Sequence, residues 1–396
     1  MTTVTPENAK KRILMICPFA RPNEGGVESH LDKLIDYLAG HKVFVYLISY
    51  QPLTTSTKGK PVEKGQNFVI YRINWFGQGW FNRIEKYFPL TFLYLVPGLL
   101  YRNIIFYLKN HQKIDTIHAH GFAAAFVAKV LKRIHKKRTV VSTHAVYNLE
   151  KRKVLASLVR WLLSSFDFIL AVGEASKEEL IRIGIDSGKV RVHPNWVDTD
   201  TFKPHGKKES RRLSNLPQDK FIILFVGRLI AKKGILLLIE IAKQVSGEMV
   251  FVIVGAEGPE SSQVDKAAET LGSFINVKGL PAAGKPKQEA ISRYYNSADM
   301  FVLPSQYPEG FASVILEGIA CGTPIISTNT GCVPQIIDES VGVLLNPTKD
   351  NLKEIFEYFY RHRDKLKEKA RNCRPYALEH FSEKNAEIIL NSYQDD

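Results

Sequence analysis

Short apolar segments alternate with amphipathic segments along this chain, and the alternation begins a second time near its middle. Segments that are apolar throughout are typical of strands in parallel sheets, which helices cover on both faces. The expected helices include residues 27–39, 122–134, 150–165, 176–183 and 235–245. The expected strands are residues 12–16, 43–49, 68–73, 116–118, 139–143, 168–172, 190–193, 221–226, 249–254, 276–278, 300–303, 324–327 and 342–344. This rhythm predicts an α/β protein with two Rossmann-like, doubly wound parallel-sheet domains facing a cleft.

Residues 195–219 interrupt the alternation. They are rich in Pro, Lys and Arg, and we interpret them as an interdomain linker. The 396 residues are enough for two domains of about 100–200 residues each. We place the first domain at residues 1–197 and the second at residues 198–376. A ligand is then expected where the carboxyl ends of the strands of the two sheets face each other.

The composition excludes several classes of protein. Hydrophobic residues make up 45% and charged residues 24%, so a disordered chain, a collagen repeat and a coiled coil are not expected. The four cysteines form no C-x-x-C motif, which fits a reducing compartment better than a disulfide scaffold. No secretory signal is recognised. The uncharged residues 88–101 are interrupted by Pro97 and Gly98, so we expect no membrane-spanning helix.

The positive charge is confined to the first half. Residues 1–197 hold 29 Lys and Arg against 14 Asp and Glu, a net of +15, whereas the rest hold 25 against 26, a net of −1. A one-sided excess of this kind indicates a partner with negative charge: a nucleic acid, an anionic membrane or a phosphorylated substrate.

Two turns that link a strand to a helix carry residues suited to phosphate. Gly25 and Gly26 follow the first strand and precede a helix, where the backbone can approach a ligand and the helix start offers N–H groups to an anion. In the second half, Arg228 and Lys233 stand between a strand and the next helix, where fixed cations suit a diphosphate. Each turn could also be a plain solvated loop.

Two glutamates eight residues apart form the most specific pattern. Glu309 is expected at the start of a helix over residues 312–320 and Glu317 two turns along it, roughly 12 Å away along the axis. This separation suits an extended ligand such as a nucleotide sugar, with one carboxylate on the sugar hydroxyls and one on a ribose diol. The amides of Phe311, Ala312 and Ser313 are expected to face the anion between them.

Taken in order, these segments resemble the retaining glycosyltransferases of family 4. The similar segments are T-I-H-A-H at 116–120, S-T-H at 142–144, H-P-N-W-V-D at 193–198, G-R-L-x-x-K-K-G at 227–234 and P-E-G-F-A-S-V-I-L-E at 308–317. The last of these, with G-T-P-I-I-S after it, is the specific part, and the similarity extends over residues 13–393. The resemblance implies the two-domain GT-B fold, with a final segment, residues 377–396, that crosses back to the first domain.

The resemblance also implies an activity. A sugar passes from a UDP-, GDP- or ADP-sugar to an acceptor hydroxyl with retention of configuration. The family includes phosphatidylinositol mannosyltransferases and lipopolysaccharide core glucosyltransferases, so we expect a lipid-linked or glycan acceptor and a peripheral position on the cytoplasmic side of the cell membrane. A soluble transferase that makes a free disaccharide or polysaccharide is the alternative.

In the second half, the resemblance gives four residues a role. Arg228 and Lys233 match the pair that binds the donor diphosphate. Glu309 matches the first motif glutamate, which faces the donor sugar, and Glu317 matches the second, which holds the ribose hydroxyls.

In the first half, the resemblance singles out the glycine turn and three histidines. Gly25 and Gly26 match a loop that closes over the phosphates and the acceptor. His118 or His120 matches the histidine beside the reacting sugar, and His144 matches a further histidine in the cleft. Since His118 and His120 are two apart, they are expected on the same face of a strand, where a core role is the other interpretation.

No metal ion or other cofactor is expected. Arg228 and Lys233 can neutralise the diphosphate that a metal ion otherwise bridges, and the D-x-D sequence from Asp198 to Asp200 lies in the linker. The two nearby histidines lack an evident third zinc ligand. The chain departs from the family at Trp196, where the linker usually has a glycine.

Six cations of the first half are interpreted as a membrane-surface patch, since they lie in a domain with an aromatic stretch at residues 75–107. They are Lys129, Lys132, Arg133, Lys136, Lys137 and Arg138. Nucleic-acid binding is the rival from another class, but no nucleic-acid-binding module is recognised. A solvated basic helix above core aromatic residues remains the purely structural alternative.

Overall fold

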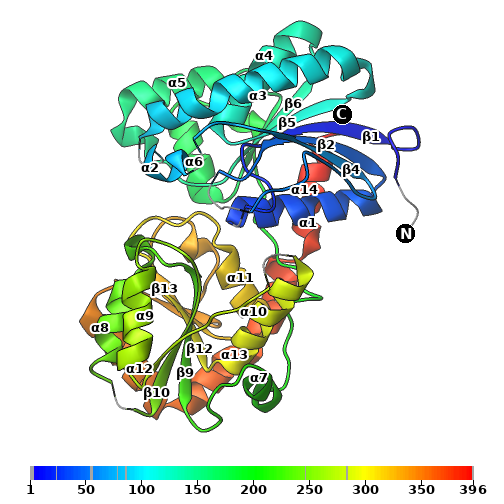
Figure 1. Cartoon of the computed structure of the whole chain (residues 1–396). Helices are drawn as coiled ribbons and strands as arrows, with labels where there is room; N and C mark the ends of the chain where they lie inside the picture. The colour runs from blue at the N-terminus through cyan, green and yellow to red at the C-terminus, as the bar shows by residue number, and fades with distance from the viewer. Residues whose placement is uncertain are drawn as a thin grey trace. The chain divides into compact units, whose positions relative to one another are not determined.

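The computed structural model describes residues 4–23, 25–53, 57–77, 79–84, 87–245, 247–281 and 284–394. The chain divides into two compact units (Figure 1). Unit 1 is Met1–Asn195 with Glu383–Asp396, and unit 2 is Trp196–Ser382. Each unit is a largely parallel sheet with helices on both faces, so the predicted fold class is confirmed.

Unit 1 is built on an eight-stranded sheet in the order β3-β4-β2-β1-β5-β6-β7-β8, in which only β3 is antiparallel to its neighbour. Its strands are β1 (Lys11–Ile16), β2 (Val43–Tyr50), β3 (Val62–Lys64), β4 (Phe68–Ile73), β5 (Thr116–His120), β6 (Arg138–Thr143), β7 (Phe168–Ala171) and β8 (Val190–Val192). Its helices are α1 (Gly26–Gly40), α2 (Trp80–Ile84), α3 (Phe88–Asn110), α4 (Phe122–His135), α5 (Lys153–Leu163), α6 (Glu174–Arg182) and α14 (Ala386–Asn391).

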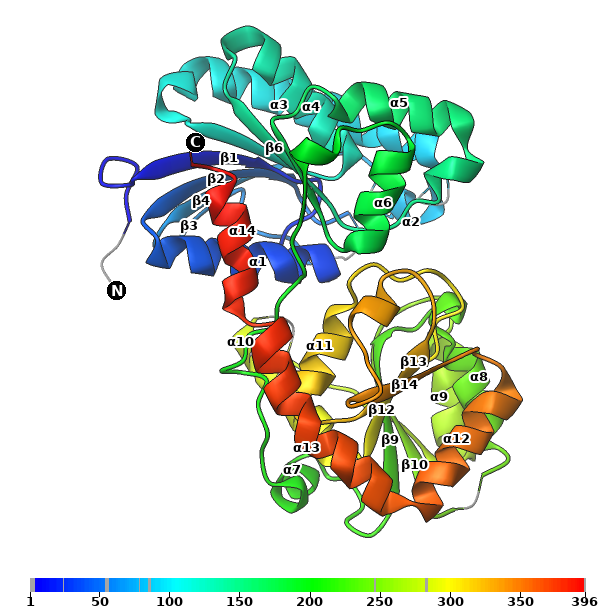
Figure 2. The ribbon, with the colours of Figure 1, turned by 180° about the vertical axis from the view of Figure 1, so that it is seen from behind.

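The central strands of this sheet are apolar because both faces are covered. Every residue of β2 and β5 is buried. Helices α3, α4 and α5 lie over one face, and α1 and α14 lie over the other (Figures 1 and 2). The final helix α14 therefore belongs to the amino-terminal sheet although it is last in the sequence.

Unit 2 is a six-stranded, all-parallel sheet in the order β11-β10-β9-β12-β13-β14. Its strands are β9 (Phe221–Arg228), β10 (Met249–Ala256), β11 (Phe274–Asn276), β12 (Met300–Leu303), β13 (Ile325–Thr328) and β14 (Gly342–Leu345). Its helices are α7 (Lys207–Leu213), α8 (Ile235–Ala242), α9 (Ser261–Thr270), α10 (Lys285–Ser297), α11 (Ser313–Ala320), α12 (Lys349–Arg361) and α13 (Arg363–His380). Helices α8, α9 and α12 pack together, as do α10, α11 and α13 (Figure 2).

Most of the segment interpreted as a linker belongs to unit 2. It contains helix α7, which packs on α10. Arg211 of α7 is buried, forms an ion pair with Asp299 at 2.8 Å and donates to the carbonyl of Ser297. The returning segment is also shorter than expected: α13 stays in unit 2, and the chain re-enters unit 1 at Glu383 rather than at residue 377.

Helix α3 continues through Pro97 and Gly98, where the sequence indicated a break. Pro97 has no N–H to donate, and the hydroxyl of Tyr50 stands beside this turn. It donates to the carbonyl of Leu95 at 2.6 Å and accepts from the N–H of Leu99 at 2.9 Å. A Cβ on Gly98 would lie 2.6 Å from this hydroxyl, so the close approach requires glycine.

Among the described residues, one helical segment, Pro89–Lys113, is long and apolar enough by length and composition to cross a membrane. One face of α3 nevertheless packs into the core of unit 1, where Leu99 and Tyr107 are fully buried. We therefore treat α3 as a helix of this unit.

We predict that Tyr50→Phe lowers the free energy of unfolding by about 1–3 kcal/mol, because two buried backbone groups of α3 lose a hydrogen bond. Tyr107→Phe is the matched control, since the Tyr107 hydroxyl is buried in the same helix without a hydrogen-bond partner among the described residues. Urea unfolding of both variants measures the difference. Equal effects of the two changes would contradict the role of Tyr50.

Candidate functional site

Four loops gather at the carboxyl end of the unit 2 sheet. They follow β10, β9, β12 and β13, which are neighbours in that order. Because all four strands are parallel, their carboxyl ends meet at one edge, where ligands bind in sheets of this kind. Arg228, Lys233 and Glu309 all lie on these loops or at a strand end.

Lys233 and Glu309 form an ion pair although 76 residues separate them. The Lys233 ammonium lies 2.7 Å from both carboxylate oxygens of Glu309, and the Ser305 hydroxyl donates to the same carboxylate. The two charged side chains are largely buried, with 21% and 13% of their surface exposed. Glu309 lies in the loop before α11, which begins at Ser313. The prediction that Glu309 stands at the start of this helix is therefore wrong.

Two glycines with positive φ hold this pair by close backbone contact. Gly234, at φ +77°, packs so tightly that a Cβ would lie 2.2 Å from the carbonyl oxygen of Pro304. Gly331, at φ +61°, packs on Glu309, where a Cβ would lie 2.0 Å from the carbonyl oxygen. The N–H of Cys332 donates to that same carbonyl at 2.9 Å. The loops that carry Lys233 and Glu309 are therefore fixed by their backbones.

The neighbouring cations differ in their surroundings. Arg228 ends β9, is exposed and has no ion-pair partner in the part of the chain that the structure describes. The Lys232 ammonium stands 4.5 Å from the centre of the Tyr307 ring. Arg228 is thus available to an anionic ligand at this edge.

Glu317 lies on α11 and is half-buried. The Tyr295 hydroxyl is 3.3 Å from the Glu317 carboxylate and donates to the carbonyl of Val314 at 2.7 Å. Burial, with the Glu317 carboxylate beside it, raises the pKa of Tyr295 well above its usual value. Tyr295 therefore stays a hydroxyl donor that orients Glu317.

The three residues expected to offer amides lie at the start of α11. Ala312 is the N-cap residue and gives no side-chain cap, and Ser313 is the first helical residue. The Phe311 side chain is buried, with its ring 5.7 Å from that of Phe381. Phe311 therefore serves packing in addition to any role of its backbone.

In unit 1, Gly25 and Gly26 lie at the start of α1, Gly25 as the N-cap. A Cβ on Gly26 would meet no heavy atom of the described structure within 4 Å. A Cβ on Gly25 would meet only the flexible side chain of Glu28. Packing within the protein therefore does not require glycine at these two positions. The space beside them can admit a ligand.

Five histidines come together in unit 1, four of them buried and His144 half-buried, and the sequence singled out three of the five. His118, His120 and His144 are joined by His30 of α1 and His193 after β8. The His118 and His120 rings are 4.1 Å apart, and His30 lies 5.4 Å from His144 and 5.7 Å from His193. His193 belongs to the H-P-N-W segment that resembles the family, so the sequence could have singled it out. The residues around His30 form no comparable motif.

The two strand histidines have different partners. His118 uses both ring nitrogens, one with the Tyr393 hydroxyl at 2.6 Å and one with Ser142 at 2.8 Å. His118 thus anchors the segment after α14. His120 shares a hydrogen bond of 3.1 Å with His144. That one of these two histidines stands beside the reacting sugar stays a prediction.

The pKa values of all five histidines are lowered, mainly by burial. They reach about 4 for His144 and about 3 for His193. The cluster is therefore neutral at pH 7. The described residues include no group of three or more His, Cys, Asp or Glu arranged to hold a metal ion.

The first two of the six cations interpreted as a membrane patch are committed to contacts within unit 1. Lys129 is buried, donates to the Trp161 carbonyl and lies 3.6 Å from the centre of the Trp161 ring. Lys132 forms an ion pair with Asp167 at 2.8 Å. Lys129 and Lys132 are therefore engaged within unit 1, which the interpretation of six surface cations did not expect.

The other four cations vary in exposure. Arg133 and Lys136 are exposed, while Lys137 and Arg138 are half-buried. The Arg138 guanidinium lies 5.3 Å from the Phe168 ring centre. Arg133 and Lys136 are thus the most accessible of the six.

Asp198, the first residue of the D-x-D sequence, is engaged locally. Its carboxylate accepts from the N–H groups of Asp200 and Thr201 at 3.0 and 3.1 Å and from the Thr201 hydroxyl at 2.6 Å. The aspartate therefore caps a turn.

Two family models match the chain, one on each half. Residues 24–201 match Glycosyltransferase Family 4, and residues 206–380 match Glycosyl transferases group 1.

Curated relatives match over most of both chains. The GPI3 subunit of phosphatidylinositol N-acetylglucosaminyltransferase from Saccharomyces cerevisiae is 27% identical over 350 residues, 85% of this chain and 72% of the relative. The D-inositol 3-phosphate glycosyltransferase of Paenarthrobacter aurescens is 26% identical over 309 residues, 72% of this chain and 74% of the relative.

Solved structures share the fold over nearly the whole length. Sucrose-phosphate synthase from Thermosynechococcus elongatus matches with a TM-score of 0.78 at 19% identity, covering 97% of this chain and 98% of the other. HepE from Anabaena in complex with UDP matches with a TM-score of 0.74 at 18% identity, covering 96% and 99%. These matches confirm the two-domain GT-B fold.

We predict that the free energy of unfolding falls as the pH is lowered from about 6.5 to 4. The unfolded chain binds protons at its histidines near pH 6.5, whereas the buried cluster stays neutral, so each such histidine contributes up to about 1.4 kcal/mol per pH unit. His193→Leu should reduce this slope, because it removes one titrating group whose ring nitrogens have no hydrogen-bond partner among the described residues. Urea unfolding from pH 7 to 4 tests this, and an unchanged slope would count against it.

Proposed function

We propose that the chain is a nucleotide-sugar glycosyltransferase that transfers the sugar with retention of configuration and without a metal ion. The activity is supported by the matches of its two halves to the Glycosyltransferase Family 4 and Glycosyl transferases group 1 models and by the curated relatives. The proposed acceptor is a hydroxyl of a phosphorylated inositol in a lipid at the cytoplasmic face of a membrane. The observation that carries the proposal is the fixed Lys233–Glu309 pair at the carboxyl end of the unit 2 sheet.

We assign the donor diphosphate to Arg228 and Lys233. A guanidinium and an ammonium at a strand end supply charge-assisted hydrogen bonds to phosphate oxygens. Arg228 is exposed at this edge, and Lys233 is held in place by Gly234. Glu317, oriented by Tyr295, is assigned to the ribose hydroxyls.

Glu309 is assigned to the donor sugar. Its carboxylate is held by Lys233 and Ser305, so its position is set before a ligand arrives. A carboxylate fixed in this way stabilises positive charge that develops on the sugar as the bond to the diphosphate breaks. Lys233 therefore has two roles, one toward the leaving diphosphate and one in positioning Glu309.

Metal independence is supported by the same cations. Arg228 and Lys233 can balance the charge of the leaving diphosphate, which in other transferases a divalent ion does. The carboxylate of Asp198 is engaged in its own turn. A histidine near the sugar is proposed to be His120.

The proposed acceptor rests on a chemical group that the names of the relatives have in common. One set acts on phosphatidylinositol and another on D-inositol 3-phosphate, so both names contain an inositol that carries phosphate. A lipid acceptor is favoured because unit 1 combines its net positive charge with apolar side chains at the surface. A free inositol phosphate is the soluble alternative.

We predict different losses for the two donor cations. Arg228→Ala should weaken the binding of a nucleoside diphosphate tenfold to a hundredfold, since a charge-assisted contact contributes about 1.5–3 kcal/mol. Lys233→Ala should weaken binding similarly and also lower kcat, because Glu309 loses its positioning partner. Calorimetry and steady-state kinetics measure both effects.

Lys232→Ala is the matched control, since this lysine lies beside Lys233 but stands over Tyr307. It should change nucleotide affinity less than threefold, because Lys232 is exposed and its charge is screened by solvent and salt. If Lys232→Ala and Lys233→Ala had the same effect, the assignment of Lys233 would be wrong.

A transfer assay tests the proposed reaction as a whole. Labelled nucleotide sugars are incubated with vesicles that contain phosphatidylinositol, with and without EDTA. We predict that label enters the lipid fraction, that EDTA leaves the rate unchanged within about twofold, and that the product keeps the anomeric configuration of the donor by NMR. Transfer to D-inositol 3-phosphate alone would support the soluble alternative, and loss of activity in EDTA that Mg²⁺ restores would exclude the metal-free proposal.

A further inference from the structure

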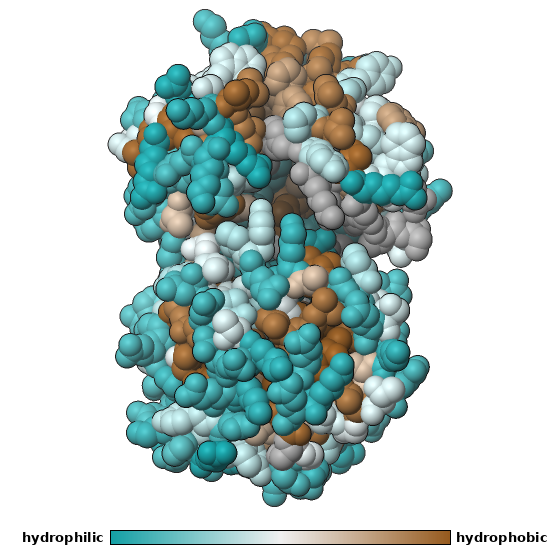
Figure 3. All heavy atoms as spheres, turned by 90° about the vertical axis from the view of Figure 1, so that its left-hand side faces the viewer, coloured by the Kyte–Doolittle hydropathy of each residue, from teal (hydrophilic) through white to brown (hydrophobic). Residues whose placement is uncertain are grey.

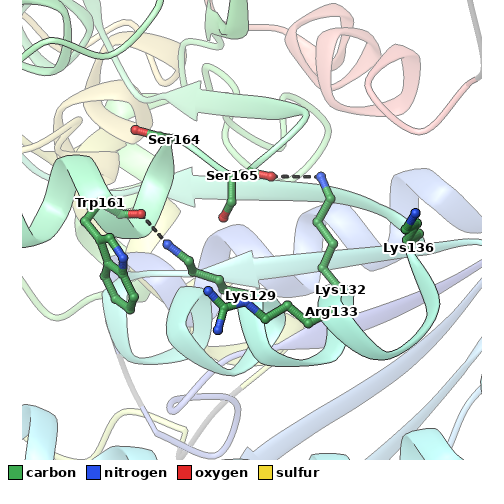
Figure 4. A pocket seen from close by; sticks show the side chains of 7 residues that line it. All are labelled: Lys129, Lys132, Arg133, Lys136, Trp161, Ser164 and Ser165. Atoms are coloured by element: carbon green, nitrogen blue, oxygen red, sulfur yellow. Dashed lines mark hydrogen bonds between the residues drawn. The ribbon is translucent and has the colours of Figure 1, made fainter.

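Helices α4 and α5 border a groove of about 600 Å³ that plays no part in the site described above. Three cations of α4, Lys129, Lys132 and Arg133, line it together with Lys136, which follows the helix. The spacing of three and four residues from Lys129 places Lys132 and Arg133 on the same face of α4. The opposite wall is formed by Trp161 of α5 and by Ser164 and Ser165, which follow that helix (Figure 4).

The inner cations are tied to the end of α5. Lys129 donates to the carbonyl of Trp161, and Lys132 donates to the carbonyl of Ser165 at 2.8 Å (Figure 4). Lys132 also pairs with Asp167. Lys129 keeps N–H groups that the described contacts do not use, whereas Lys132 has three contacts for its three donors, with Ser165 and with both carboxylate oxygens of Asp167. The inner cations hold the groove together and add to its positive potential.

The outer cations are open to the groove. Arg133 and Lys136 are exposed, and neither has an ion-pair partner in the described part of the chain. The only carboxylate paired with any of the four cations among the described residues is Asp167. Like charges three and four residues apart repel one another, so an anion between them relieves that repulsion. Burial lowers the pKa of Lys129, and the positive charge of Arg133 lowers it further.

One apolar side chain, that of Trp161, lines this basic groove, and others of α5 and α3 are exposed at the surface. On α5, Val154, Leu158 and Trp161 follow at helical spacing and are 78%, 55% and 52% exposed. On α3, Leu93 and Tyr101 are also exposed. Contacts of α3 with α4 and of α4 with α5 place the three helices in one layer, and apolar side chains gather on the outer surface of unit 1 (Figure 3).

Cations beside exposed aromatic and aliphatic side chains are the combination found at membrane interfaces, where the cations meet headgroups and the apolar groups enter the acyl boundary. We propose that the α4–α5 groove is a phosphate-binding site that takes the headgroup of an anionic phospholipid, while α5 inserts its apolar side chains beside it. This inference deepens the membrane part of the proposed function and lies outside the donor site.

The test is the binding of the full chain to vesicles of phosphatidylcholine with 20% phosphatidylinositol as the probe. Arg133→Gln with Lys136→Gln should weaken binding roughly thirtyfold, since each basic residue near an anionic surface contributes about a factor of five. Lys129 and Lys132 are left in place because they hold α5. Donor hydrolysis, which depends on unit 2, should be unchanged, so failure of this proposal is distinguishable from failure of the proposed function.

Arg102→Gln with Lys109→Gln is the matched control, with the same change of charge at exposed positions of α3 outside the groove. It should weaken binding no more than about threefold. Equal losses in the two double variants would show diffuse attraction without a site and would overturn the proposal.

Two further measurements identify the source of the phosphate. Leu158→Gln should lower vesicle binding several-fold in high salt, where the apolar contribution remains. Inositol phosphate in solution should compete only at millimolar concentration, since it offers no apolar part. If it binds the groove as tightly as the vesicles do, or if Leu158→Gln has no effect, the ligand is a free phosphate ester and the lipid assignment is wrong.

Discussion

The ion pair between Lys233 and Glu309 organises the carboxyl end of the unit 2 sheet. Its two charges are largely withdrawn from water, where an unpaired charge is costly. The pair therefore keeps the loops after β9 and β12 together, and Gly234 and Gly331 allow the backbone contacts that hold them. Arg228, at the end of β9, lies at the same edge of the sheet.

Unit 1 depends on buried polar contacts of a different kind. The Tyr50 hydroxyl bridges α3 at Pro97, and Tyr393 ties the end of the chain to His118. These contacts tie α3 and the end of the chain to strands β2 and β5 of the sheet. We propose that unit 2 binds the nucleotide sugar and that unit 1 binds the acceptor and the membrane.

Much of this architecture could be predicted because strands buried on both faces leave an apolar signature, and Arg228, Lys233 and Glu309 follow such strands. Their contact could not be predicted, since it depends on β9 and β12 being neighbours although β10 and β11 intervene in sequence. A count of charges likewise could not reveal that Lys129 is buried. His30 was missed because its partners come from distant strands.

We infer that the carboxyl end of the unit 2 sheet binds the nucleotide sugar, and a crystal structure of the chain with a bound nucleoside diphosphate tests this inference. We expect phosphate oxygens within hydrogen-bond distance of Arg228 and Lys233, and the ribose hydroxyls on Glu317. A nucleotide bound elsewhere, with none of these three side chains in contact, would exclude this assignment of the donor site.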